Sequence, residues 1–250
     1  MPLVSISDNQ RKPLPLAKFM TTIHHGIPAN LHRPLFEKGS YLAFLGRISP
    51  EKRPDRAIRI ARAAGIPLKI AAKVDKIDED YFRNDILPLI EGPGVEFIGE
   101  INEREKTRFL GEAGALLFPV DWPEPFGVVM IEAMACGTPV LAFRCGSIPE
   151  VVEDGVTGKV VGSEEEAIGA LPAILAYDRR AVRQRFEDRF TSARMAKDYV
   201  STYRRLLKTG TSRARPRQAA LNGGDGLAPI SIEKPFAALF EAGADPEIPI

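Results

Sequence analysis

The sequence predicts an α/β protein built on a doubly wound, Rossmann-like parallel sheet of about six strands. Short apolar runs alternate along the chain with segments of helical periodicity, which is the order expected of βαβ units. The apolar runs are also continuous rather than alternating with polar residues. Continuous runs are typical of parallel strands that are buried on both faces.

Each element follows from its local pattern. The apolar runs predict strands over 18–24, 41–45, 68–74, 95–98, 115–119 and 139–143. The segment 54–64 has apolar residues at helical spacing, with Pro54 in its first turn and Gly65 after its end. Similar periodicity predicts helices over 78–90, 102–113 and 127–136, and further helices that begin near Ser147, Glu164, Arg179 and Ser192.

Both ends of the chain differ from this pattern. Residues 1–15 are polar and contain three prolines, and residues 209–229 are rich in Gly, Arg, Pro and Ala. Such compositions are typical of linkers or disorder. We therefore expect one folded domain over 18–208, preceded by a linker region over 1–17 and followed by a largely disordered tail over 209–250.

Composition excludes several classes of protein. The formal net charge of +1 over 250 residues argues against a general nucleic-acid binder, which needs a basic surplus. The two cysteines form neither a disulfide framework nor a zinc motif. We expect no metal, since His24 and His25 are adjacent and would point apart on a strand. Without a secretory signal or an apolar run of about 20 residues, we expect a cytoplasmic protein without a transmembrane segment; peripheral contact with a membrane stays open.

The stretch DWPEPFGVVMIEAMACG, from Asp121 to Gly137, carries the most chemical information. Glu124 lies in a Pro-flanked loop after a predicted strand, and Glu132 lies on the next helix. Free amides and the helix dipole at a helix start favour oxygen ligands and anions. The amides in question belong to Phe126, Gly127 and Val128. The two acids could bind hydroxyls at the two ends of a diphosphate-linked ligand; the alternative is an acid near a helix start and a solvated acid on a helix face.

A second stretch, GRISPEK, follows a strand and precedes a helix. Gly46 permits close approach of the backbone, Arg47 offers a planar fork for phosphate, and Lys52 a mobile charge. Two exposed basic residues in a loop are the plainer alternative. Ligands of such sheets bind beyond the carboxyl ends of the strands, so Gly46, Lys73, Gly99 and the loop 120–126 should converge on one crevice.

Together these motifs resemble the retaining GT-B glycosyltransferases of the group 1 type. Glu124–x7–Glu132 resembles their E-x7-E signature, and GRISPEK resembles their diphosphate-binding loop. The run CGSIPEVVEDGVTG, from Cys145 to Gly158, is similar to the segment that follows the signature. HHGIP, from His24 to Pro28, resembles the entry to their C-terminal domain. All motifs occur in order between about Thr21 and Leu207, so the resemblance implies the C-terminal, donor-binding half of a GT-B fold.

The resemblance implies a role for each matching residue. Arg47 and Lys52, with Gly46, would hold the donor diphosphate and stabilise its leaving charge, and Glu124 would bind hydroxyls of the sugar. Glu132 would bind the ribose. The sugar and distal phosphate would rest on backbone from Phe126 to Val128, and the base would meet backbone at Ile98 and Gly99. Lys73 either adds a phosphate contact or is a salt-bridged surface lysine.

The resemblance also implies an activity that needs a second domain. It implies a nucleotide-sugar-dependent, retaining hexosyltransferase without metal or other cofactor, with a UDP-sugar favoured and a GDP- or ADP-sugar as alternatives. The acceptor is unknown. Residues 1–17 would be a remnant of the N-terminal domain and linker, so we expect completion by an N-terminal GT-B domain on another chain or by a homodimer. The alternative is a nucleotide-sugar-binding module or pseudoenzyme without transferase activity.

Overall fold

The computed structural model describes residues 2–211 and contains a parallel sheet of six strands. The strand order is β5-β4-β3-β6-β7-β8, and every neighbouring pair is parallel. The strands are β3 (Tyr41–Arg47), β4 (Leu68–Lys73), β5 (Val95–Gly99), β6 (Ala113–Phe118), β7 (Val140–Phe143) and β8 (Gly158–Val161). The chain runs outward from β3 to β5, returns to β6 beside β3, and runs outward again to β8. This order confirms the predicted doubly wound α/β fold.

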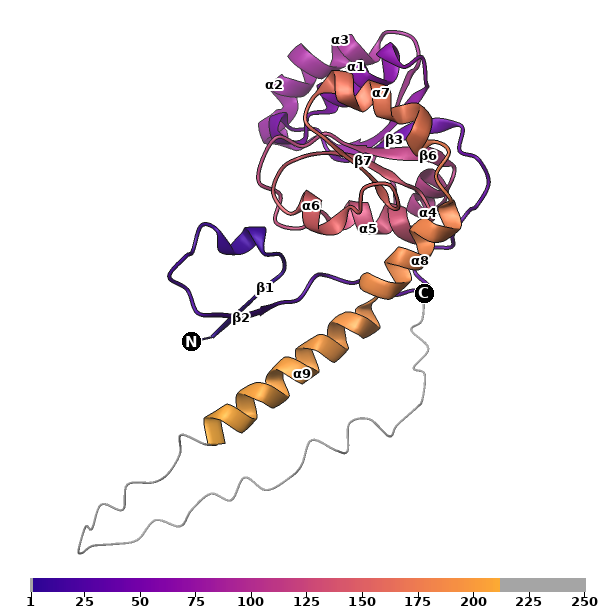
Figure 1. Ribbon diagram of the computed structural model, residues 1–250. Coiled ribbons are helices and arrows are strands. Elements are labelled where there is room, and N and C mark those ends of the chain that lie inside the picture. Colours follow the sequence, from indigo (N-terminus) through magenta and orange to yellow (C-terminus); the bar gives the residue numbers. More distant parts are fainter. Residues whose placement is uncertain (1, 212–250) are drawn as a thin grey trace, which may run out of the picture. The chain divides into compact units, whose positions relative to one another are not determined.

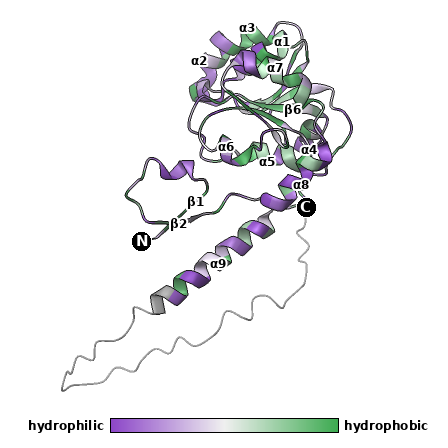
Figure 2. Ribbon diagram, in the orientation of Figure 1, coloured by the Kyte–Doolittle hydropathy of each residue, from purple (hydrophilic) through white to green (hydrophobic). Residues whose placement is uncertain are grey.

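Helices cover both faces of this sheet, as Figure 1 shows. One face carries α1 (Pro54–Ala63), α2 (Glu79–Tyr81), α3 (Leu87–Ile90) and α7 (Glu164–Ile174); the other carries α4 (Glu103–Gly111), α5 (Val128–Ala135), α6 (Ile148–Val151) and α8 (Arg179–Arg189). Successive strand residues point to opposite faces, so Leu42 and Ala43 belong to two separate apolar cores. Hydrophobic residues accordingly gather on the strands, which are mostly green in Figure 2.

Local signals explain where the helices begin. Asn102 caps α4, because its side-chain oxygen accepts hydrogen bonds from the amides of Arg104 and Glu105 while the Glu105 side chain returns to the Asn102 amide. Pro54 occupies the first turn of α1. The predicted helix 78–90 is interrupted, since a π-helical turn, η4 (Phe82–Ile86), separates α2 from α3. Three further short turns are 3-10 helices: η1 (Asn9–Arg11), η2 (Pro50–Lys52) and η3 (Lys76–Asp78).

The prediction was wrong about which strands form the sheet. The predicted strand 18–24 exists as β2 (Phe19–Thr22), but it pairs in parallel with β1 (Leu3–Ser5) in a separate two-stranded sheet. The sixth position of the main sheet belongs instead to β8, which the sequence did not indicate. The carboxylate of Glu150 in α6 accepts hydrogen bonds from the amides of Asp8 and Asn9, at 2.7 and 2.8 Å.

A buried arginine links the start of β6 to the segments around it. Arg179, which opens α8, is only 8% exposed. Its guanidinium donates hydrogen bonds of 2.7 Å to four acceptors, which are the carbonyl oxygens of Leu35, Gly111 and Ala113 and the hydroxyl of Thr138. Burial lowers the pKa of this guanidinium.

The chain leaves the sheet through one long helix, α9 (Ser192–Thr211). No helix among residues 2–211 is long and apolar enough to cross a membrane. The tail that we predicted over 209–250 lies outside the described residues from position 212 onward.

Candidate active site

The carboxyl ends of β3 and β6 and the start of α5 enclose a pocket of about 220 Å³. Its walls combine apolar strand residues with charged loop residues. The lining residues are Phe44, Leu45, Gly46, Arg47, Lys52, Phe118, Val120, Glu124, Gly127, Val128 and Val129. The pocket lies at the point where the strand order reverses, which is the usual ligand site of doubly wound sheets. Six residues that the sequence singled out therefore line this one pocket: Gly46, Arg47, Lys52, Glu124, Gly127 and Val128.

An ion pair spans this pocket. Lys52, at the end of η2, places its Nζ 2.5 Å from Oε2 of Glu124, in the loop between β6 and α5. Both side chains are mostly buried, with 17% and 12% exposed. The indole nitrogen of Trp122 donates a hydrogen bond of 2.9 Å to the same Oε2. The Lys52 ammonium also lies 5.2 Å from the centre of the Trp122 ring. In this structure the two principal charges of the pocket neutralise each other.

The start of α5 forms another wall. Gly127 precedes the helix with φ of 76°, and a Cβ there would lie 2.7 Å from Cε of Met130 and 3.1 Å from the Phe118 ring. Glycine is therefore required for this turn. The first amides of α5 have no acceptor within the helix, and they open beside Val128, which is 41% exposed. An anion in the pocket could accept hydrogen bonds from this end of the helix.

Phe126 anchors the same loop from below. Its side chain is 2% exposed and packs against the rings of His24, His25 and Phe190. The adjacent histidines were expected to alternate along a strand. They lie beyond the end of β2, so the strand alternation does not apply, and both ring centroids lie within 6 Å of Phe126, at 5.8 and 5.1 Å. Burial, followed by the effect of His24, lowers the pKa of His25.

Two further basic residues end the neighbouring strands β3 and β4. Arg47 ends β3 with its side chain half exposed, and its guanidinium lies 3.3 Å from Glu51 and 3.4 Å from Asp75. Lys73, at the end of β4, forms a 2.9 Å ion pair with Asp75 and does not line the pocket. The hydrogen bond from Lys73 lowers the pKa of Asp75. Lys73 is thus a salt-bridged lysine in this structure, directly opposite Arg47 in the register of β3 and β4.

Glu132 lies on α5 one turn beyond Val128, so the two residues share a face of the helix. Its Oε1 is 2.9 Å from Nζ of Lys106, which also contacts Glu103 at 3.0 Å. Ligand atoms of Glu132, Glu103 and His32 lie within 4.8 Å of one another, the spacing of a metal site. The Lys106 ammonium already bridges both carboxylates there. Burial lowers the pKa of His32, so its ring is neutral at neutral pH.

Ile98, which was predicted to meet the base, does not line the pocket between β3 and α5. Its side chain lines a different hollow of about 430 Å³, beneath α4, together with Tyr41 and Lys69. The prediction concerned the backbone at the end of β5, where Gly99 adopts a φ of 74°. The side chain of Ile98 therefore does not contribute to the pocket between β3 and α5.

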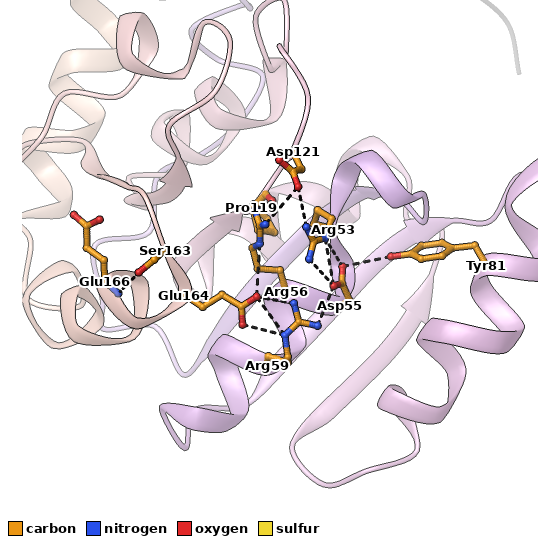
Figure 3. A network of polar contacts seen from close by, with 10 residues as sticks. All are labelled: Arg53, Asp55, Arg56, Arg59, Tyr81, Pro119, Asp121, Ser163, Glu164 and Glu166. Carbon is orange, nitrogen blue, oxygen red and sulfur yellow. Dashed lines mark hydrogen bonds and ion pairs between the residues drawn. The ribbon is translucent and has the colours of Figure 1, made fainter.

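A charged network fixes the two loops that carry Lys52 and Glu124 (Figure 3). Arg53 donates to Asp55 in α1 and to Asp121, three residues before Glu124. Asp121 also donates its amide to the carbonyl of Glu51, at 2.9 Å. The network continues through Arg56, Arg59, Glu164 and Tyr81. Arg53 has a φ of 54°, the single positive value of a residue other than glycine between positions 2 and 211.

Sequence reasoning missed the contacts by which three residues hold the acidic groups in place: Trp122, Lys106 and Arg53. Trp122 stands two positions before Glu124, so the sequence alone shows that the two residues are close. It does not show that the indole donates a hydrogen bond to the carboxylate. Lys106 is 26 residues from Glu132. Nothing in the local pattern indicates that pairing, because it depends on how α4 packs beside α5.

Comparison with known proteins identifies the family. The family model of glycosyl transferases group 1 matches residues 31–189. The chain belongs to this family. It is 31% identical over 200 residues to a D-inositol 3-phosphate glycosyltransferase of Rhodococcus erythropolis, covering 71% of this chain and 45% of that protein. This group 1 chain spans about half the length of the curated relatives it matches.

Solved structures of glycosyltransferases share its fold. AviGT4, a glycosyltransferase involved in avilamycin A biosynthesis, is 28% identical with a TM-score of 0.70, over 82% of this chain and 64% of that one. HepE of Anabaena, in complex with UDP and glucose, is 19% identical with a TM-score of 0.69, over 80% and 62%. These matches confirm the prediction of a Rossmann-like half of a GT-B glycosyltransferase.

Proposed function

We propose that this group 1 chain is the donor-binding half of a retaining glycosyltransferase that uses a nucleoside diphosphate sugar. The observation that supports it is the pocket between β3 and α5, where Arg47, Lys52 and Glu124 meet the start of a helix. Two cations and free helix amides suit a diphosphate, and a carboxylate suits sugar hydroxyls. The distance from this pocket to Glu132, one turn along α5, suits a ligand that continues to a ribose.

In this proposal each group acts on a different part of the donor. Lys52 leaves Glu124 for the diphosphate, and Arg47 turns to it from its half-buried acidic partners, Glu51 and Asp75. Their charges stabilise the negative charge that grows on the leaving nucleoside diphosphate in the transition state. Glu124, freed from its ion pair, accepts hydrogen bonds from the sugar. Glu132 accepts hydrogen bonds from the ribose hydroxyls, with Lys106 orienting its carboxylate through the 2.9 Å contact.

A UDP-sugar is the first donor to test, with GDP- and ADP-sugars as alternatives. HepE, which shares the fold, has been crystallised with UDP-glucose. The acceptor would be held against the sugar by a second, N-terminal GT-B domain. Among residues 2–211 there is one large sheet, which provides a single wall of such a cleft. Positioning of the acceptor and exclusion of water supply much of the rate, so we expect this chain alone to bind donor weakly and to transfer no sugar.

The test is calorimetric titration of the purified chain with UDP-, GDP- and ADP-glucose, followed by a transfer assay. We expect weak binding of one donor and its loss in Lys52→Met. Absence of binding to all three would refute the proposal.

The transfer assay separates the proposed enzyme from a binding module. It is run with and without an N-terminal domain from a group 1 relative. Transfer only after that addition supports the enzyme, binding without transfer in either case supports the module, and turnover by the chain alone would contradict the need for a second wall.

A further inference from the structure

We propose that Trp122 is a positioning residue that keeps the Glu124 carboxylate directed at the sugar after Lys52 has turned to the diphosphate. This inference rests on the proposed function. The observation behind it does not depend on a ligand, however, because it is a hydrogen bond between two residues of one loop.

Both donors to Glu124 meet the same oxygen. Lys52 Nζ lies 2.5 Å and Trp122 Nε1 lies 2.9 Å from Oε2. No hydrogen bond or ion pair reaches Oε1 from residues 2–211. One oxygen is therefore held by the protein, and the other is available to a ligand hydroxyl. Each carboxylate oxygen can accept about two hydrogen bonds, so Oε2 is fully used by Lys52 and Trp122 while Oε1 keeps its acceptor sites.

The backbone of Glu124 is clamped on three sides, so orientation of its side chain is what remains to be fixed. The Glu124 amide donates to the Trp122 carbonyl at 2.7 Å, and its carbonyl accepts from the Ser147 amide at 3.0 Å. Gly146 packs so closely that a Cβ there would lie 2.4 Å from the Glu124 nitrogen. Trp122 thus holds Glu124 twice, once through the backbone and once through the indole.

A bound diphosphate would affect the two hydrogen-bond donors, Lys52 and Trp122, differently. The Lys52 ammonium is mobile and is attracted by a diphosphate, so its contact with Glu124 is exchanged when the ligand binds. The indole N–H is neutral, does not titrate and has no acceptor capacity. It has no comparable attraction to leave the carboxylate. The hydrogen bond from Trp122 is therefore the contact that persists, and it keeps Glu124 from following Lys52 toward the phosphates.

The test uses Trp122→Phe, which keeps an aromatic ring and removes the donor. The donor is first chosen by titration with UDP, GDP, ADP and their glucose esters. We expect Trp122→Phe to bind the free nucleoside diphosphate as the parent chain does, and to bind the glucose ester about five- to tenfold more weakly. A structural role alone would weaken both ligands equally. Equal weakening, or no change for either ligand, would overturn the inference.

A double-mutant cycle identifies the partner of Trp122. In a Glu124→Ala background, Trp122→Phe should have no further effect on affinity for the glucose ester. An undiminished effect in that background would show that Trp122 acts on the sugar directly or on another group, and would refute a role through Glu124.

Nuclear magnetic resonance tests the contact without any ligand. Trp122 is the single tryptophan of the chain, so a ¹⁵N-labelled sample gives one indole N–H signal. We expect Glu124→Gln to move this signal upfield, because the charged acceptor is lost, and the exposed-site control Glu96→Gln to leave it in place. An unchanged signal in Glu124→Gln would overturn the inference. Failure of all nucleotides to bind would instead refute the proposed function, and this measurement would still decide the contact.

Discussion

Replacing Glu124 with glutamine is expected to tighten binding of a free nucleoside diphosphate and to weaken binding of the corresponding nucleotide sugar. The opposite signs follow from the ion pair with Lys52. A diphosphate must draw Lys52 away from Glu124, and this exchange costs part of the binding free energy. Glutamine attracts the ammonium less strongly, so Lys52 becomes available. The sugar, in contrast, loses a charged acceptor.

The size of the effect follows from the burial of the pair. The Lys52 and Glu124 side chains are 17% and 12% exposed, so the pair is neither fully solvated nor fully buried. Exposed pairs contribute about 0.2–1 kcal/mol, whereas breaking a buried pair costs about 3–5 kcal/mol. An intermediate value of about 1–2 kcal/mol corresponds to about five- to thirtyfold in affinity. We expect Glu124→Gln to bind the free nucleoside diphosphate more tightly than the parent chain does, by up to this factor in affinity.

Calorimetric titration of the parent chain and of Glu124→Gln, with the free nucleoside diphosphate and with its sugar ester, measures the two effects. Glu96→Gln is the matched control, because it makes the same charge change at an exposed acid of β5 that pairs with Lys69. Its affinities should equal those of the parent chain. Weaker binding of the diphosphate by Glu124→Gln would show that the ion pair does not compete with the phosphates, and would refute the reasoning.

Three further variants test other parts of the structure. Lys106→Met should weaken binding of the free diphosphate about tenfold in calorimetry, since it removes a charged hydrogen bond that orients Glu132; unchanged affinity would contradict that role. Arg179→Met should lower the free energy of unfolding in urea by at least about 3 kcal/mol, because buried acceptors lose their donor, and a loss below about 1 kcal/mol would contradict it. Gly146→Ala, at φ of 57° and against the Glu124 backbone, should cost about 2 kcal/mol of stability and weaken the sugar ester more than the diphosphate.

The sequence predicted local structure well and pairing between strands poorly. The run FMTT forms a strand, as its composition indicates, but its partner is β1 rather than the main sheet. Periodicity describes a strand and does not name its neighbour. Strand β8 was missed because it is short, lies at the sheet edge and begins with Gly158. That glycine has a packing reason, since a Cβ would lie 2.0 Å from the carbonyl oxygen of Val140.

The candidate site shows the same division. The sequence indicated that Arg47, Lys52 and Glu124 would meet, because each follows a strand whose carboxyl end lies at one edge of the sheet. It did not indicate which charges would pair. The contact of Lys52 with Glu124 joins residues 72 positions apart, and its geometry depends on how two loops pack. The assignments of donor groups to individual residues, including Glu132 and Ile98, remain predictions.

The sheet order also determines when the pocket can exist during folding. Strands β3, β4 and β5 come from one continuous segment, so that half of the sheet can form through short-range contacts. The pocket needs β6 and the start of α5 as well. Pairing of β6 with β3 closes a longer loop, and such non-local pairing forms more slowly than local contacts. A half-formed sheet would therefore not bind donor. Ligand at 100 times its dissociation constant would add about 2.7 kcal/mol to the free energy of unfolding of the whole domain. Amide hydrogens of β5, although far from α5 in the strand order, should then gain protection together with those of β6.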